Sequence, residues 1–338
     1  MFPAARLSAA IGRLSEASVV VIGDLITDEY LFGKPARISR EAPVLILRFS
    51  EREVCLGGAA NAAHNVAVLG ARVLPVGVVG EDAAADDLRT LLTRAGIATD
   101  GLVPTRARPT PVKTRIMAGG YQSSRQQVVR LDREPDTPIP PDVEDRLIDR
   151  IQRLGARVSA FLISDYGYGT VTPRVLASVR ELARASGAVV TADSRYDLLR
   201  FTGVTAATPN EPEVEALTGT VCADGPAVEK AGWQVLDRLD ARYLLVTRGS
   251  RGMALFERGG PATFLPVHGH DEIADVTGAG DTVISTFTVA LASGADAGLA
   301  AWLANVAGGV VVMKRGTATA SPGELLAALP SDGRPPRD

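Results

Sequence analysis

Residues 18–24 have the sequence Ser18-Val19-Val20-Val21-Ile22-Gly23-Asp24, and this stretch decides the fold. An uninterrupted run of β-branched residues is typical of a strand that is buried on both faces of a parallel sheet. Most of the similar runs further along the chain are separated by amphipathic stretches of helical period, such as residues 59–69 and 173–185. This alternation predicts an α/β fold with a doubly wound, mostly parallel central sheet flanked by helices. The similar runs are residues 73–79, 160–163, 188–192, 204–206 and 243–247.

Two segments interrupt the alternation of strands and helices. Residues 33–50 and 110–133 contain extended pieces in which apolar and polar side chains alternate with a period of two. We expect them to form a small β-sheet lid on a single domain that comprises residues 1–330. Residues 331–338 are rich in Pro, Arg and Asp and are predicted to be a disordered tail.

The composition excludes several classes of protein. The 338 residues are 46% hydrophobic and 22% charged, with a net charge of -3, so a large core is expected and a nucleic-acid partner is not. No stretch reaches the roughly 18 consecutive apolar residues that a membrane helix needs, so no membrane association is expected. Cys55 and Cys222 lie far apart and suggest neither a disulfide framework nor a zinc site. We predict a cytoplasmic protein.

The most informative chemical motif is Asp275-Val276-Thr277-Gly278-Ala279-Gly280-Asp281-Thr282, directly before an apolar helical pattern. Gly278, Ala279 and Gly280 carry almost no side chain, so backbone N–H groups at the start of the helix can approach an anion closely. Asp281 in the same turn would lie beside a transferred phosphate and could accept the proton of an attacking hydroxyl. The alternative is that Asp281 only caps the helix and that the glycines only form a tight turn.

This octapeptide resembles the second signature of the ribokinase and phosphofructokinase-B family. The resemblance to the family as a whole extends from about residue 15 to 328. In that family the final Asp is the catalytic base, and the Gly-Ala-Gly amides form the anion hole. The resemblance implies a ribokinase-like, ATP-dependent sugar kinase that uses Mg²⁺, and it leaves open a requirement for a monovalent cation such as K⁺. A decayed sugar- or nucleotide-binding module is the non-enzyme alternative, and the intact motif argues against it. A dinucleotide-dependent oxidoreductase would need Gly-x-Gly-x-x-Gly after the first strand, which is absent.

Two further segments resemble the sugar-binding elements of the family. Gly57-Gly58-Ala59-Ala60-Asn61 resembles its first signature, in which paired glycines let the backbone approach the sugar and the Asn binds sugar hydroxyls. Asp24, which the first strand delivers to its C-terminal edge, resembles the family's sugar-binding carboxylate. The alternative is that the glycines only form a tight start of a helix.

The resemblance also implies a nucleotide site in the second half of the chain. Asn210-Glu211-Pro212-Glu213 resembles an Asn-x-x-Glu element that organises magnesium and phosphate, with Glu213 acting on Mg²⁺ mainly through water. Helix capping is the alternative for Asn210, and an ordinary helix Asn is the alternative for Asn305. The nucleotide-binding residues expected from the resemblance are Arg195, Asn210, Thr247, Arg248, Gly249, Gly252, Thr277 and Asn305.

Within the family, the sequence is most similar to the heptose 7-phosphate kinase branch. Residues 37–44 and 126–132 resemble the two ends of that branch's lid, although Asp193-Ser194-Arg195 stands where the branch usually has Asp-Pro-Lys. The resemblance implies phosphorylation of the anomeric hydroxyl of a heptose 7-phosphate to heptose 1,7-bisphosphate; another sugar or sugar phosphate is the alternative acceptor. Three lid cations could pair with a substrate phosphate, or could simply be solvated side chains of an edge strand. They are Lys113, Arg115 and Arg130.

The lid segments also bear on the assembly of the protein. Residues 37–49 and 112–131 would leave sheet edges exposed in a monomer, and family members with this lid often pair lids across a two-fold axis. We therefore predict a homodimer through the lid. The nucleotidyl-transferring half of the fused enzymes is not part of this sequence, so adenylyl transfer is expected to need another protein.

Overall fold

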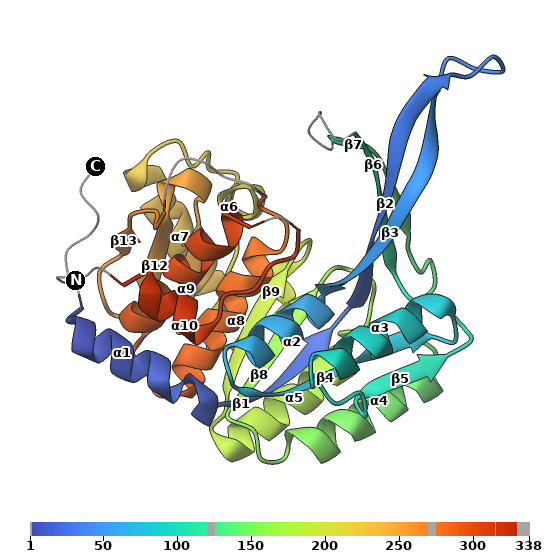
Figure 1. Cartoon of the computed structure of the whole chain (residues 1–338). Helices are drawn as coiled ribbons and strands as arrows, with labels where there is room; N and C mark the ends of the chain where they lie inside the picture. Colours follow the sequence, from blue (N-terminus) through green and yellow to red (C-terminus); the bar gives the residue numbers. More distant parts are fainter. Residues whose placement is uncertain (1, 120–125, 270–274, 315, 330–338) are drawn as a thin grey trace.

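Two sheets form the frame of the molecule (Figure 1). The computed structural model describes residues 2–119, 126–269, 275–314 and 316–329. Within these ranges the larger sheet has nine strands in the order β13-β12-β11-β10-β9-β8-β1-β4-β5, and the smaller has four in the order β3-β2-β6-β7. The predicted fold class, a mostly parallel sheet flanked by helices with a small additional sheet, is confirmed.

The larger sheet is parallel from β5 to β11, and β12 and β13 run antiparallel at its edge. The sequence predicted most of the parallel strands but missed β5, β12 and β13, whose sequences contain no run of β-branched residues. The strands are β1 (Ser18–Gly23), β4 (Arg72–Gly80), β5 (Leu102–Thr105), β8 (Ala160–Asp165), β9 (Val189–Ser194), β10 (Ala206–Ala207), β11 (Tyr243–Thr247), β12 (Met253–Glu257) and β13 (Thr263–Leu265).

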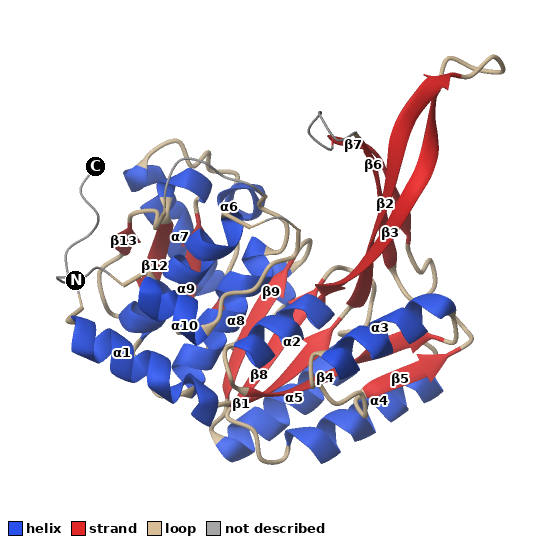
Figure 2. Ribbon diagram, viewed as in Figure 1, coloured by secondary structure: helices blue, strands red, loops and turns tan. Residues whose placement is uncertain are grey.

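Helices cover both faces of this sheet and create two hydrophobic cores (Figure 2). Successive side chains of a strand point to opposite faces, so Val19 and Val21 lie in one core while Val20 and Ile22 lie in the other. This explains why the run at 18–22 is apolar without interruption. One core packs on α1 (Ala4–Arg13), α2 (Ala59–Val68), α3 (Ala83–Arg94), α8 (Ala279–Ala292), α9 (Ala297–Val312) and α10 (Pro322–Ala327); the other packs on α4 (Pro141–Gly155), α5 (Pro173–Ser186), α6 (Glu211–Thr218) and α7 (Gly225–Leu239).

The smaller sheet, called the lid below, projects from the body of the molecule (Figure 1). It consists of β2 (Leu25–Ile38), β3 (Leu45–Gly58), β6 (Val112–Ala118) and β7 (Gln126–Arg133). The β2–β3 and β6–β7 pairs are antiparallel, whereas β2 and β6 run parallel. The first hairpin is longer than the predicted segment 33–50, because β2 begins immediately after Asp24 and β3 continues to the start of α2.

Some sequence-based expectations are not addressed by the described residues. The predicted tail at 331–338 lies outside them, as do residues 120–125 of the lid. No helix in the described ranges is both long and apolar enough to span a bilayer. The cytoplasmic location stays a prediction.

Candidate active site

A cavity of about 690 Å³ lies where the lid meets the main sheet. Its walls come from the lid, from the segments that follow β8, β9 and β11, and from the first turns of α6 and α8. Open α/β sheets bind ligands at the carboxyl ends of their strands in this way. The cavity brings together most of the predicted site residues: Gly58, Lys113, Arg115, Arg130, Arg195, Asn210, Glu213, Thr247, Arg248, Gly249, Thr277, Gly278, Gly280 and Asp281.

Asp281 lies in the first turn of α8 and is only 4% exposed. Its Oδ2 accepts a hydrogen bond from Nδ2 of Asn61 at 2.7 Å, and its Oδ1 accepts one from the hydroxyl of Tyr166 at 3.1 Å. Gly278, which precedes the helix, has a φ of +79°, and a Cβ there would lie 2.8 Å from Nδ2 of Asn61. The turn therefore requires glycine, and it holds a carboxylate where the helix dipole favours an anion.

The small residues of the turn face two cavities. Gly278 and Gly280 line the main cavity, while Ala279 lines an adjoining one. The N–H of Ala279 donates to the carbonyl of Val276 at 3.2 Å, so one of the three predicted anion-hole amides already has a partner.

Burial dominates the electrostatics of the carboxylates in this cavity. It raises the pKa of Asp281 to about 6, although the hydrogen bonds from Asn61 and Tyr166 act to lower that pKa. Burial raises the pKa of Asp193 to about 8, and the neighbouring carboxylates of Glu213 and Asp281 raise it further. A carboxylate with a pKa near 6 is mostly ionised at neutral pH and is well matched to the work of a general base.

Asn210 and Glu213 cap α6 reciprocally. Oδ1 of Asn210 accepts the N–H of Glu213 at 2.8 Å, and Oε2 of Glu213 accepts the N–H of Asn210 at 2.9 Å. The alternative interpretation of Asn210 as a helix cap is therefore confirmed. The other oxygen of Glu213 lies 3.6 Å from Nη1 of Arg195.

Asp193 and Glu213 fit a hydrated Mg²⁺ better than a directly ligated metal. Within the described ranges, no three His, Cys, Asp or Glu side chains are grouped so that they could hold a metal ion directly. Glu213 raises the pKa of Asp193, so a cation at this wall would favour the ionised form of both carboxyl groups. Mg²⁺ keeps most of its waters and needs few carboxylates, so both side chains would act on it mainly through water.

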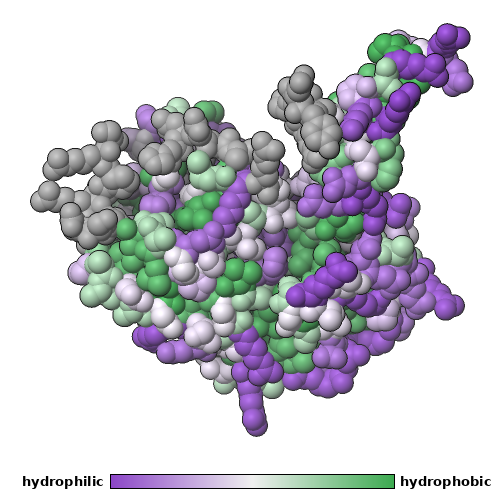
Figure 3. Space-filling view, viewed as in Figure 1, coloured by the Kyte–Doolittle hydropathy of each residue, from purple (hydrophilic) through white to green (hydrophobic). Residues whose placement is uncertain are grey.

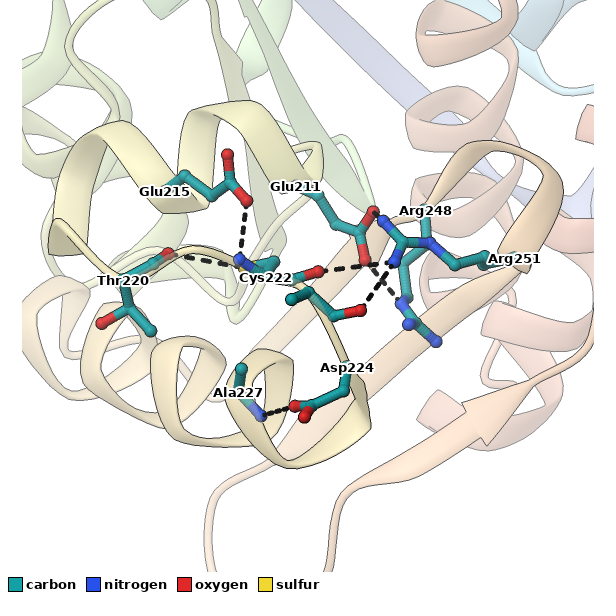
Figure 4. Close-up of polar contacts among 9 residues, drawn as sticks. Glu211, Glu215, Thr220, Cys222, Asp224, Ala227, Arg248 and Arg251 are labelled. Carbon is teal, nitrogen blue, oxygen red and sulfur yellow. Dashed lines mark hydrogen bonds and ion pairs between the residues drawn. The ribbon is translucent and has the colours of Figure 1, made fainter.

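The segment after β11 is joined to α6 by ion pairs to the buried Glu211 (Figure 4). Nε of Arg248 donates to Oε1 of Glu211 at 2.8 Å, and Nη2 of Arg251 donates to Oε2 of the same carboxylate. Glu211 is 6% exposed and the side chain of Arg248 is 10% exposed. Because both carboxylate oxygens are used, Glu211 fixes the position of Arg248, which lines the cavity beside Thr247 and Gly249.

An adjoining cavity of about 230 Å³ has largely apolar walls and is lined by two further predicted nucleotide residues, Gly252 and Asn305. Nδ2 of Asn305 donates to the carbonyl of Pro266 at 2.7 Å, so this amide also has a structural partner. The two cavities share four lining residues, which are Thr247, Gly249, Val276 and Gly280.

The lid cations face the main cavity, and two of them have acidic partners that the sequence did not predict. Nη1 of Arg115 donates to Oδ1 of Asp28 at 2.6 Å, and both side chains are almost buried. Nε and Nη2 of Arg130 donate to the two oxygens of Asp132 at 2.9 and 2.8 Å. The predicted phosphate contacts of Arg115 and Arg130 would therefore have to share these guanidinium groups with carboxylates.

The position of Asp24 does not agree with its predicted role as a sugar contact. It is 1% exposed and is not among the residues that line the cavity. Its carboxylate accepts the N–H groups of Tyr166, Tyr168 and Thr170 at 2.8, 3.1 and 3.2 Å. The end of β1 packs directly against β8, since a Cβ at Gly23 would lie 1.8 Å from the carbonyl oxygen of Ser164, and Asp24 consequently faces the loop after β8.

The first-signature residues pack around the base of the lid. A Cβ at Gly57 would lie 2.5 Å from Oδ2 of Asp28, and a Cβ at Gly58 would lie 2.6 Å from the carbonyl oxygen of Asp24. Only Gly58 lines the main cavity, whereas Gly57 lies next to it in β3. Asn61 reaches the site through its hydrogen bond to Asp281.

The cavity also contains residues that were not predicted as site residues, among them Asp28, Asp165, Tyr166 and Asp193. Asp165 and Asp193 lie at the ends of β8 and β9, so the rule that singled out Asp24, a polar residue at the end of a buried strand, would have found them. Asp28 lies within β2 and gave no such signal.

The sequence of residues 16–323 matches the model of the pfkB family of carbohydrate kinases. The chain belongs to the pfkB family. A carbohydrate kinase transfers a phosphoryl group to an alcohol, so the predicted enzyme class is confirmed.

Curated relatives extend beyond the matched region. The bifunctional protein HldE of Geobacter sulfurreducens is 42% identical over 313 residues, which are 92% of this chain and 63% of the relative. The bifunctional protein HldE of Pseudomonas aeruginosa is 42% identical over 318 residues, which are 94% of this chain and 64% of the relative. The chain thus spans less than two thirds of the length of these relatives.

Solved structures share the fold at low sequence identity. Arabidopsis thaliana ribokinase in complex with ribose and ATP has a TM-score of 0.71 and 20% identity, with 92% of this chain and 98% of that chain covered. Escherichia coli phosphofructokinase-2 in complex with potassium has a TM-score of 0.76 and 18% identity, with coverages of 92% and 97%. The ribokinase-like architecture predicted from the sequence is confirmed.

Proposed function

We propose that this sugar kinase uses ATP to phosphorylate the anomeric hydroxyl of a heptose 7-phosphate, which gives heptose 1,7-bisphosphate. The observation that carries the proposal is one cavity that contains both a buried carboxylate, Asp281, and the cationic lid side chains Lys113 and Arg130. The similarity to the HldE proteins and the lid sequences at 37–44 and 126–132 support the heptose phosphate as acceptor.

In the proposed reaction, Asp281 removes the proton of the anomeric hydroxyl as its oxygen attacks the γ-phosphorus. A bond forms between that oxygen and phosphorus, the bond from phosphorus to the β,γ-bridging oxygen breaks, and ADP leaves. Backbone N–H groups of the turn at 278–281, apart from that of Ala279, which donates to Val276, hold the charge that develops on the phosphoryl oxygens. Asp193 and Glu213 would hold Mg²⁺ through water, and the ion would neutralise part of the phosphate charge of ATP.

The other residues that line the two cavities fall into a group that suits the acceptor and a group that suits the nucleotide. Arg guanidinium groups match phosphate oxygens in charge and geometry, which suits Arg130 and Arg115 to the 7-phosphate. The adjoining cavity with Gly252 and Asn305 is largely apolar and suits the adenine ring. Arg248, held by Glu211, lies on the wall that would receive the nucleotide phosphates.

An acceptor screen tests the proposal. ADP release is measured with heptose 7-phosphate, the unphosphorylated heptose, fructose 6-phosphate and ribose, in buffers containing either K⁺ or Na⁺. We expect kcat/KM to be highest for heptose 7-phosphate, and Asp281→Asn gives the background rate of ATP hydrolysis. A higher kcat/KM for fructose 6-phosphate or ribose would replace the heptose phosphate with that acceptor.

We also propose that two copies pair through their lids. Figure 3 shows apolar side chains among polar ones on the projecting hairpin. Such side chains at 45–70% exposure are typical of a surface covered by a partner. We expect a dimer in light scattering after size-exclusion chromatography and a monomer for Leu131→Glu; a wild-type monomer at micromolar concentration would contradict the pairing. The exposed apolar residues of the lid are Ile38, Val44, Leu45, Phe49, Val128, Val129 and Leu131.

A further inference from the structure

The loop after β8 is held in place by hydrogen bonds to the carboxylate of Asp24. The carboxylate of Asp24 accepts three backbone N–H groups of this loop, from Tyr166, Tyr168 and Thr170. Gly167 within the loop has a φ of +81°, and a Cβ there would lie 2.8 Å from the ring of Tyr196. A buried charge that uses three hydrogen bonds in one loop leaves the backbone of that loop little freedom. The backbone of Tyr166 is therefore held in place.

The side chain of Tyr166 extends from this fixed backbone to Asp281. Its hydroxyl donates to Oδ1 at 3.1 Å, the oxygen that Asn61 does not contact. Burial raises the pKa of Tyr166 well above its ordinary value, so the hydroxyl stays protonated and remains a donor throughout the working pH range. The Asp281 carboxylate is thus held at both oxygens by neutral donors from two different elements.

The ring of Tyr166 also contacts cations from both sides of the cavity. Nζ of Lys113, on the lid strand β6, lies 4.8 Å from the ring centre. Cζ of Arg195, which follows β9, lies 5.8 Å from it. Cations at these distances over an aromatic face are attracted to it. Tyr166 consequently connects a lid residue, a residue of the main sheet edge and the carboxylate.

We propose that Tyr166 is a positioning residue. Its hydroxyl holds the Asp281 carboxylate in the orientation needed for proton removal, and the contact of its ring with Lys113 makes this orientation depend on the position of the lid. This inference rests on the proposed part of Asp281 as the base. It also assigns a task to Asp24, which acts through the loop that carries Tyr166. A carboxylate oxygen has two lone pairs, so Oδ1 can accept from Tyr166 and still receive the substrate proton.

The pH dependence of turnover follows from the groups that face Asp281. Asp28 from β2 is an acidic neighbour that favours its protonated form, and Arg195 favours the ionised form. The carboxyl group of Asp193 from β9, with a pKa of about 8, is mostly protonated where Asp281 ionises. The hydroxyl of Tyr166 also favours the ionised form, because it donates to the carboxylate. Removal of this hydroxyl therefore raises the pKa of Asp281, and the acid limb of the rate profile moves to higher pH.

Tyr166→Phe tests the inference, since it removes only the hydroxyl and keeps the ring between Lys113 and Arg195. We expect kcat at pH 7 to fall about tenfold and the acid limb of the kcat profile to move up by about one pH unit. The KM for ATP should change less than about threefold, because the nucleotide walls are untouched. Both proteins are assayed with the same saturating acceptor, so titration of the substrate phosphate is common to both profiles. Equal melting temperatures check the fold.

Tyr168→Phe is the matched control in the same loop. The hydroxyl of Tyr168 donates to Glu134 at 2.8 Å rather than to Asp281, so its removal should leave the acid limb in place. A Tyr166→Phe enzyme with an unchanged kcat and acid limb, beside an inactive Asp281→Asn enzyme, would overturn the inference and leave the proposed function standing. Wild-type turnover in Asp281→Asn would instead overturn the proposed function, and with it the need to position that carboxylate.

Discussion

The edge of the main sheet and the lid contribute to one cavity through different kinds of structure. Asp281 is 4% exposed and is held by Asn61 from α2 and Tyr166 from the loop after β8. The lid cations stand on a thin sheet whose outer side chains are largely exposed, and two of them form pairs within the lid. The reacting group is thus fixed by many elements, whereas the groups expected to recognise the acceptor depend on one small sheet. We infer that chemistry resides in the body and acceptor choice in the lid.

The substitution Asp281→Asn should have the largest effect, and it tests whether the chemistry resides in the body. Loss of the general base should lower kcat by about 10²- to 10⁴-fold, while the KM values for ATP and sugar change little. Steady-state kinetics with both substrates measures this. Asp86→Asn, which alters an exposed Asp in the first turn of α3, is the matched control and should behave as wild type. Turnover near the wild-type rate in Asp281→Asn would break the assignment of chemistry to the body.

A change on the lid should have a smaller and more selective effect. Lys113→Met removes one charge that faces the cavity, so kcat/KM for a phosphorylated acceptor should fall about 10- to 100-fold, mainly through KM. The unphosphorylated sugar should lose much less, because it is affected only through the contact of Lys113 with the ring of Tyr166. Arg48→Met removes an exposed cation of β3 that does not line the cavity and serves as the control. An equal loss of kcat/KM with both sugars would show that Lys113 does not bind the phosphate of the acceptor.

The ion pairs around Glu211 lie in the body, and a change there should affect the binding of ATP but not the binding of the acceptor. In Glu211→Gln, Arg248 loses its charged partner, so the KM for ATP should rise about fivefold, the equivalent of one hydrogen bond. The KM for the acceptor should stay constant. Glu215→Gln on the same helix is the control, because Glu215 accepts only the N–H of Cys222 among its drawn contacts (Figure 4). A parallel rise in both KM values would indicate a general disturbance of the cavity.

The smallest effect concerns stability. The pKa of Asp281 is about 6 in the folded protein and 3.8 as its ordinary value, so folding is penalised by ionisation of this group. The penalty is absent below pH 3.8, develops between pH 3.8 and about 6, and is complete above that pH. Asp281→Asn should therefore melt about 1–3 °C higher than wild type at pH 8. Melting curves at pH 8 and at pH 4.5 should show this gain shrink at the lower pH.

The sequence predicts the parts of this molecule that follow local rules. The buried strands are apolar without interruption because both faces of the sheet are covered, and the turn before α8 contains its glycines and Asp281 in one octapeptide. A strand end shows which residue reaches the sheet edge but not where its side chain points, so Asp24 was expected in the cavity and Asp28 was not. The pairs Arg115–Asp28 and Glu211–Arg248 join residues far apart in the chain and leave no local pattern.

The hairpin of β2 and β3 is continuous from the main sheet to its far end. Each strand has 14 residues, a length of roughly 46 Å at about 3.3 Å per residue. Asp28 pairs with Cys55 near the cavity, and Ile38 pairs with Leu45 at the other end of the same ladder. This hairpin, with register shifts between Phe32 and Gly33 and between Pro35 and Arg37, thus links the surface expected to bind a second copy with the wall expected to bind the acceptor. Self-association and acceptor affinity are therefore expected to vary together when the protein is diluted.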